Sequence, residues 1–279
     1  MTIGVIGAGT MGGGIAEAAA QVGRVVLVDV DQARAEAGLK AIEKRLNRQV
    51  EKERIDAATR DEILSRITPT GELHDLKDVD VVVEAALEDL EVKKELFATL
   101  GTICSKDCIL GTNTSALSIT AIAAQVPQPE RVIGIHFFNP ATVMKLVEVV
   151  RTPFTSQACL DKVNSFVESL GKTSVLVEES PGFVVNRLLI PMINEAVFLL
   201  SEGVASAEDI DTAMRLGANH PMGPLALADL VGLDICLAIM ETLHEELGED
   251  KYRPAPLLSK MVRAGRLGRK TKMGFFDYN

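Results

Sequence analysis

The apolar positions of the first 180 residues gather into short runs, and most of these runs are separated by stretches with helical periodicity. Short apolar runs that alternate with helices predict a mainly parallel β-sheet with helices on both faces, an α/β fold. The predicted strands cover residues 3–6, 25–28, 79–85, 108–113, 131–138, 145–150 and 173–178.

The pattern changes near residue 180. Residues 182–265 contain no convincing strand pattern, but several helical stretches punctuated by "GANHPMGP" and "RPAP". Glycine and proline clusters of this kind end helices and form turns. We therefore expect two domains, an α/β domain over residues 1–180 and an all-helical domain over residues 181–279.

Composition narrows the class of protein. With 279 residues, of which 47% are hydrophobic, the chain can bury a substantial core. Its formal net charge of −10 argues against nucleic acid as a general partner and against anionic membranes. No apolar run reaches the ~18 residues of a spanning helix, and "MTIGVIGAG" leaves no room for a signal peptide before the first strand. We expect a cytoplasmic protein.

The four cysteines show no metal-binding or redox spacing. Cys104, Cys108, Cys159 and Cys236 are scattered along the chain without a histidine-rich neighbourhood. This favours buried or free thiols in a reducing compartment, without disulfides and without a metal site.

The turn "GAGTMG" follows the first predicted strand and opens a helix. Gly7, Gly9 and Gly12 form the pattern G-x-G-x-x-G, and Thr10 and Met11 complete the turn. In a strand–turn–helix context these glycines permit a tight turn, close backbone approach and close packing, while the helix N-terminus faces a pyrophosphate. The stretch predicts a Rossmann-type dinucleotide site, although glycines that serve packing alone are the simpler alternative.

Asp29 ends the second predicted strand, about 20 residues after the turn, where a carboxylate can bind the adenosine ribose. Its charge would repel a 2′-phosphate, which favours NAD over NADP. Arg34 is close enough in sequence to leave NADP as the less favoured alternative.

One histidine and one carboxylate interrupt the apolar runs of "VIGIHFFNPATVMKLVEVV". If the two strands form a hairpin centred near Thr142, His136 and Glu148 stand opposite each other, and their side chains meet. A carboxylate against an imidazole orients the ring and favours its charged form, which suits a general acid/base. The alternative is a structural histidine.

Three further polar residues lie where a ligand would bind. Asn113 and Ser115 follow an apolar strand, at the carboxyl edge where open α/β sheets place ligands. Ser115 is suited to bind a substrate oxygen, but it is equally suited to cap the next helix. Asn186 begins a mostly apolar helix and is expected either to face the site or to make an interhelical hydrogen bond.

A basic stripe follows the second predicted strand. Its members recur at intervals of four and so share one helix face: Lys40, Lys44, Arg48 and Lys52. Like charges at this spacing repel unless an anion or the intervening Glu43 and Glu51 offset them. The stripe is either a binding site for phosphates or a solvated helix face.

Several long stretches together resemble the 3-hydroxyacyl-CoA dehydrogenase family, and the resemblance runs in order through the whole chain. They are "GVIGAGTMGGGIA", "VVVEAALEDLEVKKELF", "NTSALSIT", "GIHFFNPATVMKLVEVV", "SPGFVVNRLLIPMINEAV", "DIDTAMRLGANHPMGPLALADLVGLD" and "RAGRLGRKTKMGFFDY". The resemblance implies an NAD-linked interconversion of L-3-hydroxyacyl-CoA and 3-ketoacyl-CoA, with short chains such as 3-hydroxybutyryl-CoA and acetoacetyl-CoA the first expectation.

The resemblance also implies roles for individual residues. His136 is the general acid/base and Glu148 orients it, while Ser115 and Asn186 bind the reacting oxygen and the histidine region. The implied cofactor contacts beyond the glycine turn and Asp29 are Glu88, Lys93, Asn113, Ser115, Asn139 and Lys270.

Two further implications concern the substrate and the assembly. A helical hairpin after the second strand contacts CoA, which favours Arg48 and Lys52 as phosphate ligands. The helical C-terminal domain implies a homodimer. Two alternatives remain: a dehydrogenase of free 3-hydroxy acids, and a non-catalytic NAD-binding or structural protein on the same fold.

Overall fold

The computed structural model describes residues 1–279. The chain forms two compact units, Met1–Glu179 and Ser180–Asn279. Each unit has its own hydrophobic core.

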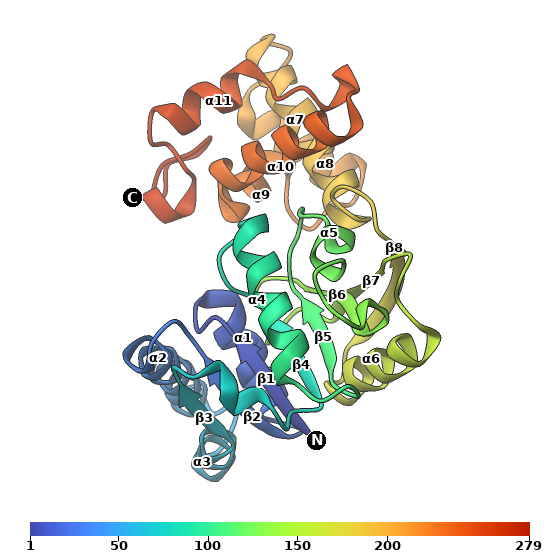
Figure 1. The fold of residues 1–279 in the computed structure, drawn as a ribbon. Helices are drawn as coiled ribbons and strands as arrows, with labels where there is room; N and C mark the ends of the chain where they lie inside the picture. Colours follow the sequence, from blue (N-terminus) through green and yellow to red (C-terminus); the bar gives the residue numbers. More distant parts are fainter. The chain divides into compact units, whose positions relative to one another are not determined.

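The first unit is built on one eight-stranded sheet with the order β3-β2-β1-β4-β5-β6-β7-β8 (Figure 1). β3 to β6 on this path pair in parallel, β7 runs antiparallel to β6, and β8 is parallel to β7. The predicted mainly parallel sheet is thus confirmed, and its first six strands have the Rossmann order. The bounds are β1 (Thr2–Ile6), β2 (Arg24–Val28), β3 (Ile67–Thr70), β4 (Val81–Glu84), β5 (Ile109–Thr112), β6 (Val132–Phe137), β7 (Leu146–Arg151) and β8 (Thr173–Glu178).

One strand is absent from the prediction. β3 has the sequence "ITPT" and lies at an edge of the sheet, where it pairs with β2 alone. Pro69 cannot donate a backbone hydrogen bond, so a strand that contains it is restricted to such an edge. A run of four residues with an internal proline carries too weak a pattern to be recognised.

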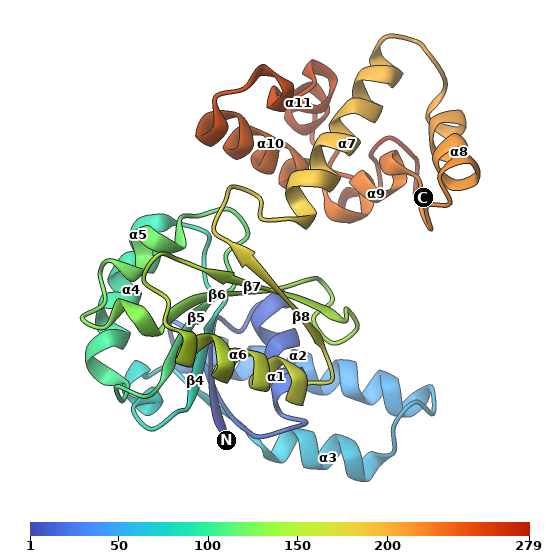
Figure 2. The ribbon, with the colours of Figure 1, turned by 90° about the vertical axis from the view of Figure 1, so that its right-hand side faces the viewer.

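Helices cover both faces of this sheet (Figure 2). α1, α2 and α6 share one core with the strands, and α4 and α5 pack against each other. α2 and α3 lie between β2 and β3, which confirms the predicted helical hairpin insertion. The bounds are α1 (Thr10–Ala19), α2 (Gln32–Glu51), α3 (Ala57–Ser65), α4 (Leu90–Ile103), α5 (Ile119–Ala123) and α6 (Gln157–Ser169), with short 3-10 helices η1 (Leu73–Leu76) and η2 (Pro129–Arg131).

Side-chain caps fix where most of these helices begin. An aspartate or serine before each of α2 to α6 accepts a backbone N–H of the first turn: Asp31, Asp56, Asp89, Ser118 and Ser156. Such caps satisfy amide donors that otherwise lack partners. α1 differs, because its N-cap residue is Gly9 and no side chain caps it.

The second unit is helical, as predicted. Its helices are α7 (Val185–Ser201), α8 (Ala207–Gly217), α9 (Pro224–Val231), α10 (Leu233–Leu247) and α11 (Pro256–Arg263), with 3-10 helices η3 (Asp250–Tyr252) and η4 (Arg269–Thr271). α7 packs against each of α8, α9, α10 and α11. Isolated bridges at Met273 shape the last turn of the chain.

A buried carboxylate ties down this C-terminal segment. Asp229 in α9 accepts hydrogen bonds from the backbone N–H groups of Phe275 and Phe276 and from the Tyr278 hydroxyl. Burial raises the pKa of Asp229, while these hydrogen bonds act in the opposite direction.

None of the helices in either unit is long and apolar enough to span a membrane.

Candidate active site

The glycine turn has the geometry that a dinucleotide requires. Gly7 has φ +91°, and a Cβ there would lie 2.5 Å from the Ala85 carbonyl oxygen. A Cβ on Gly12 would lie 1.8 Å from the Gly7 carbonyl oxygen, whereas nothing lies within 4 Å of a Cβ position on Gly9. The first and third glycines are therefore fixed by packing, and the second faces open space beside the uncapped N-terminus of α1. An anion is favoured there by the free N–H groups and the helix dipole.

Asp29 closes the same turn from the end of β2. Its Oδ2 accepts the Ala8 N–H at 2.7 Å, and its Oδ1 accepts the Val30 N–H at 2.8 Å. The carboxylate is thus anchored beside the turn, where a ribose would lie. Arg34 does not neutralise it, because Arg34 lies 4.0 Å from Asp31 in an exposed pair of little energetic weight.

The hairpin prediction is confirmed residue by residue. β6 and β7 pair with His136 opposite Glu148, and His136 Nδ1 lies 2.8 Å from Glu148 Oε2. The two side chains are 8% and 1% exposed. A carboxylate this close accepts a hydrogen bond from a protonated Nδ1, which orients the ring, and Nε2 is then the ring nitrogen that can exchange a proton.

Ser115 lies in the loop between β5 and α5. Ser118, not Ser115, caps α5 by accepting the Ala121 N–H. The alternative in which Ser115 caps this helix is therefore wrong, and its hydroxyl makes no hydrogen bond within the first unit. Asn113 instead braces the histidine strand, because its Oδ1 accepts the Phe137 N–H at 2.8 Å.

A buried ion-pair network underlies this loop. Lys93 Nζ lies 2.5 Å from Glu84 Oε1, with the two side chains 1% and 0% exposed, and 3.4 Å from Glu88 Oε2. Glu84 also accepts the Thr112 hydroxyl at 2.7 Å, and Glu88 accepts the Thr114 hydroxyl at 2.6 Å. Buried charges require such compensation, because desolvation of an unpaired ion costs several kcal/mol, about 3 or more. Glu88 and Lys93, two of the residues expected to contact the cofactor, thus belong to one cluster.

Sequence reasoning missed Glu84 and Thr112. The signal was present, because Glu84 is a carboxylate that ends the apolar strand "VVVE". A charge at the end of a buried strand needs a partner, and Lys93, one helical turn into α4, supplies it.

The remaining expected site residues lie as follows. Asn139 is exposed after β6, in a cis peptide bond with Pro140. In the second unit, Lys270 forms an ion pair with Asp234 at 2.5 Å. Asn186 is half-buried and makes no hydrogen bond inside its unit, whereas Asn194 on the same helix hydrogen-bonds the backbone of Arg253 and Ala255, in the segment between η3 and α11.

The basic stripe lies on the outer face of α2. All four members are exposed, and none forms an ion pair with Glu43, Glu51 or another carboxylate. The mutual repulsion along the stripe is therefore not offset by a direct ion pair within the protein. On the inner side of α2, Arg45 pairs at 2.9 Å with Glu17 of α1, whose pKa is raised by burial.

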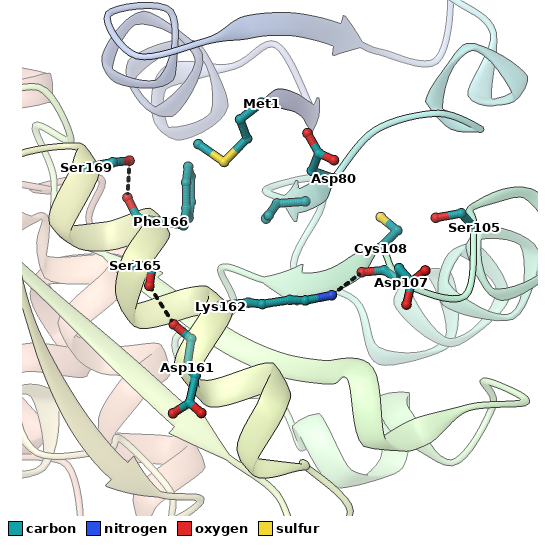
Figure 3. Close-up of a pocket in the computed structure, with 11 residues that line it drawn as sticks. Met1, Asp80, Ser105, Asp107, Cys108, Asp161, Lys162, Ser165, Phe166 and Ser169 are labelled. Atoms are coloured by element: carbon teal, nitrogen blue, oxygen red, sulfur yellow. Dashed lines mark hydrogen bonds between the residues drawn. The ribbon is translucent and has the colours of Figure 1, made fainter.

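A cavity of about 630 Å³ lies away from this chemistry (Figure 3). It is lined by Met1, Asp80 and Cys108, at the amino ends of the parallel strands, and by residues of α6. Its polar side chains bind nearby backbone, as in the hydrogen bond from Lys162 Nζ to the Asp107 carbonyl oxygen at 3.2 Å. Open α/β sheets bind ligands at the opposite edge, so this cavity is not the dinucleotide site.

The four cysteines are free and buried.

Oxidation of an alcohol carbon removes a hydride and a proton, so an enzyme for this reaction needs a dinucleotide site and an acid/base group. This unit has a dinucleotide turn and a buried imidazole–carboxylate pair, which define a dinucleotide-dependent oxidoreductase. The family follows from comparison with known proteins. The model of the 3-hydroxyacyl-CoA dehydrogenase NAD binding domain matches residues 2–180, and that of the C-terminal domain matches residues 182–278. The chain belongs to the 3-hydroxyacyl-CoA dehydrogenase family, and NAD is its cofactor.

Individual relatives are similar over 90% or more of their length. The chain is 53% identical over 280 residues to 3-hydroxybutyryl-CoA dehydrogenase of Clostridioides difficile, with 100% of both chains covered. It is 44% identical to human mitochondrial hydroxyacyl-coenzyme A dehydrogenase, with 98% of this chain and 90% of the relative covered. The crystal structure of (S)-3-hydroxybutyryl-CoA dehydrogenase from Ralstonia eutropha superposes with a TM-score of 0.95 at 47% identity, covering 100% and 99% of the two chains.

Proposed function

We propose that this enzyme interconverts (S)-3-hydroxybutyryl-CoA and acetoacetyl-CoA. The observation that carries the proposal is the buried His136–Glu148 pair, at 2.8 Å, in the unit that also holds the glycine turn. Relatives named 3-hydroxybutyryl-CoA dehydrogenase at about half identity over the full chain support this substrate.

The proposed mechanism divides the work among the chain's own residues. Bound NAD supplies the hydride acceptor. His136 takes the proton of the 3-hydroxyl during oxidation and returns it during reduction, which is worth about 10²–10⁴ in rate. Glu148 orients the ring and stabilises its positive charge, and Ser115 donates a hydrogen bond to the reacting oxygen. Asn186 is proposed to complete the histidine environment.

The cofactor is proposed to lie on the glycine turn with its ribose at Asp29. The exposed backbone of Gly9 and Thr10 and the half-buried Met11 support this position. Glu88, Lys93, Asn113, Asn139 and Lys270 are proposed as further contacts, direct or through the loops that they hold.

CoA is proposed to bind along the stripe on α2, with Arg48 and Lys52 against its phosphates. The exposure of both cations and their lack of carboxylate partners support the assignment. Arg48→Ala/Lys52→Ala should raise KM for acetoacetyl-CoA and leave kcat and NADH affinity unchanged. Lys94 on α4, which pairs with the exposed Glu91, provides a control, Lys94→Ala, that removes a cation away from the stripe.

Assembly and location complete the proposal. Exposed apolar side chains on the second unit support a homodimer through its helices, among them Leu188 at 71% and Leu216 at 81% exposure. Free, buried cysteines support the cytoplasm, where thiols stay reduced.

The test follows absorbance of the nicotinamide band with acetoacetyl-CoA and NADH, in parallel with NADPH and with free acetoacetate. Rapid oxidation of NADH with the CoA ester alone is expected. Equal turnover of free acetoacetate would replace the proposal with a 3-hydroxy acid dehydrogenase. Tight NADH binding without turnover of either substrate would contradict the proposed substrate altogether.

A further inference from the structure

The loop that carries Ser115 is held from two sides. On its first side, Glu88 Oε1 accepts the Thr114 hydroxyl at 2.6 Å and the Ser115 N–H at 3.0 Å. Thr114 Oγ1 in turn accepts the Leu117 N–H at 3.0 Å. These bonds fix the loop's start, at the end of β5.

On its second side the loop is held by Glu179, the last residue of the first unit. Glu179 Oε1 accepts the Ser118 hydroxyl at 3.0 Å and the Thr120 N–H at 3.0 Å. Its Oε2 accepts the Thr120 N–H at 3.2 Å and also the Thr120 hydroxyl. One half-buried carboxylate thus gathers three donors from a segment 59 to 61 residues away in sequence.

Ser115 depends on this restraint for its orientation. Thr114 and Ser118 both donate their hydroxyls to glutamates, whereas the Ser115 hydroxyl has no hydrogen bond within the first unit. The Ser115 hydroxyl is therefore not fixed by a hydrogen bond of its own. Its direction depends on the path of the loop backbone, which Glu88 and Glu179 hold at either end. A hydrogen-bond donor to a reacting oxygen must be held within a fraction of an ångström, about 0.5 Å.

We infer that Glu179 is a positioning residue for the reaction, acting through the loop that holds Ser115. The inference rests on the proposed function of Ser115 as donor to the substrate oxygen. It assigns to the end of the first unit a part in the chemistry that its sequence, "VEESPGF", does not suggest.

The charge and both oxygens of Glu179 are needed, because its donors converge on two acceptor atoms. In Glu179→Gln only one acceptor oxygen remains, and the amide nitrogen that replaces the other cannot accept from Thr120. The neighbouring Glu178 provides a matched control. It is 68% exposed and pairs only with Arg151 across the strands, so Glu178→Gln removes the same charge without touching the loop.

The experiment measures kcat, KM for acetoacetyl-CoA and NADH affinity for wild type, Glu178→Gln, Glu179→Gln, Ser115→Ala and the double variant Ser115→Ala/Glu179→Gln. Glu179→Gln should lose about tenfold or more in kcat with NADH affinity within about twofold, and Glu178→Gln should match wild type. The double variant should be no slower than Ser115→Ala alone, because Glu179 acts only through that hydroxyl.

Three outcomes overturn the inference. The inference is wrong if Glu179→Gln has the same kcat as Glu178→Gln. It is also wrong if the losses from Glu179→Gln and Ser115→Ala multiply in the double variant, because the role of Glu179 would then be structural. Thermal unfolding of each variant identifies a loss that follows from misfolding, and a large drop in Tm with multiplied losses counts against positioning. If Ser115→Ala is fully active while wild type turns over acetoacetyl-CoA, the inference falls with the role of Ser115. If wild type has no activity, the proposed function itself has failed.

Discussion

Replacing Glu148 by glutamine removes the charge from the buried pair while preserving its shape. The side chain of Glu148 is 1% exposed and lies 2.8 Å from His136 Nδ1. A glutamine oxygen can still accept the Nδ1 proton, so the ring should keep its orientation. What is lost is the negative charge that stabilises the imidazolium formed when an alcohol is oxidised.

The size of the effect follows from two bounds. A hydrogen bond to a charged group is worth about 1.5–3 kcal/mol and a neutral one about 0.5–1.5 kcal/mol, a difference of about 1 kcal/mol or slightly more. The attraction of two unit charges at about 4 Å near a protein surface reaches about 4 kcal/mol, which is the upper bound. We therefore expect Glu148→Gln to lower kcat for oxidation by about 10- to 10³-fold.

The assay is the initial rate of NADH formation from 3-hydroxybutyryl-CoA and NAD at saturation, measured across a range of pH. NADH affinity and the circular dichroism spectrum should match wild type, because the glycine turn is untouched. A variant with kcat within about twofold of wild type and the same pH–rate profile would refute the reasoning, since the charge would then contribute nothing to the proton transfer.

Further variants test the frame around the site. Asn113→Ala removes the acceptor of the Phe137 N–H and should lower the free energy of unfolding by about 1–3 kcal/mol, with Asn113→Asp losing less, as measured by urea denaturation; equal stabilities would contradict this. Gly12→Ala places a Cβ 1.8 Å from a carbonyl oxygen of the turn and should weaken NADH binding at least about tenfold by titration; unchanged affinity would contradict the packing argument. The raised pKa of buried Glu17 means that the folded state binds its proton more tightly, so wild-type stability falls as pH rises upward from the ordinary value of 4.5. Glu17→Gln has no such titration, so the difference in Tm between this variant and wild type should shift in the variant's favour as pH rises from about 4 to about 7. The variant also removes the charged partner of Arg45, which lowers its stability without reversing this trend.

The sequence pattern was sufficient for the parts of the fold that depend on local periodicity. The strand–turn–helix at Gly7–Gly12 and the pairing of His136 with Glu148 follow from residues close together in sequence. β3 was not predicted because Pro69 interrupts its apolar pattern. Its place at the sheet edge depends on its pairing with β2.

The supports of the site depend on contacts that no local pattern encodes. Thr112 and Glu84 meet across adjacent strands 28 residues apart, and Glu179 reaches Ser118 across 61 residues. A serine three residues after Ser115 proved to be the helix cap, and both serines fit the same local preference. Only the tertiary arrangement distinguishes the serine that caps from the serine left for a ligand.

The hairpin between β6 and β7 also affects how the chain assembles. His136 and Glu148 are 12 residues apart, whereas the starts of β1 and β4, joined by the bond from Thr2 to Asp80, are 78 residues apart. Loop-closure entropy grows with the logarithm of length, which makes the longer closure costlier by about 1.7 kcal/mol. The acid/base pair is thus brought together by a short-range contact, whereas the pairing of β1 with β4 requires a long-range one. Substitutions that hinder long-range assembly should therefore slow the pairing of β1 with β4 more than formation of the catalytic pair.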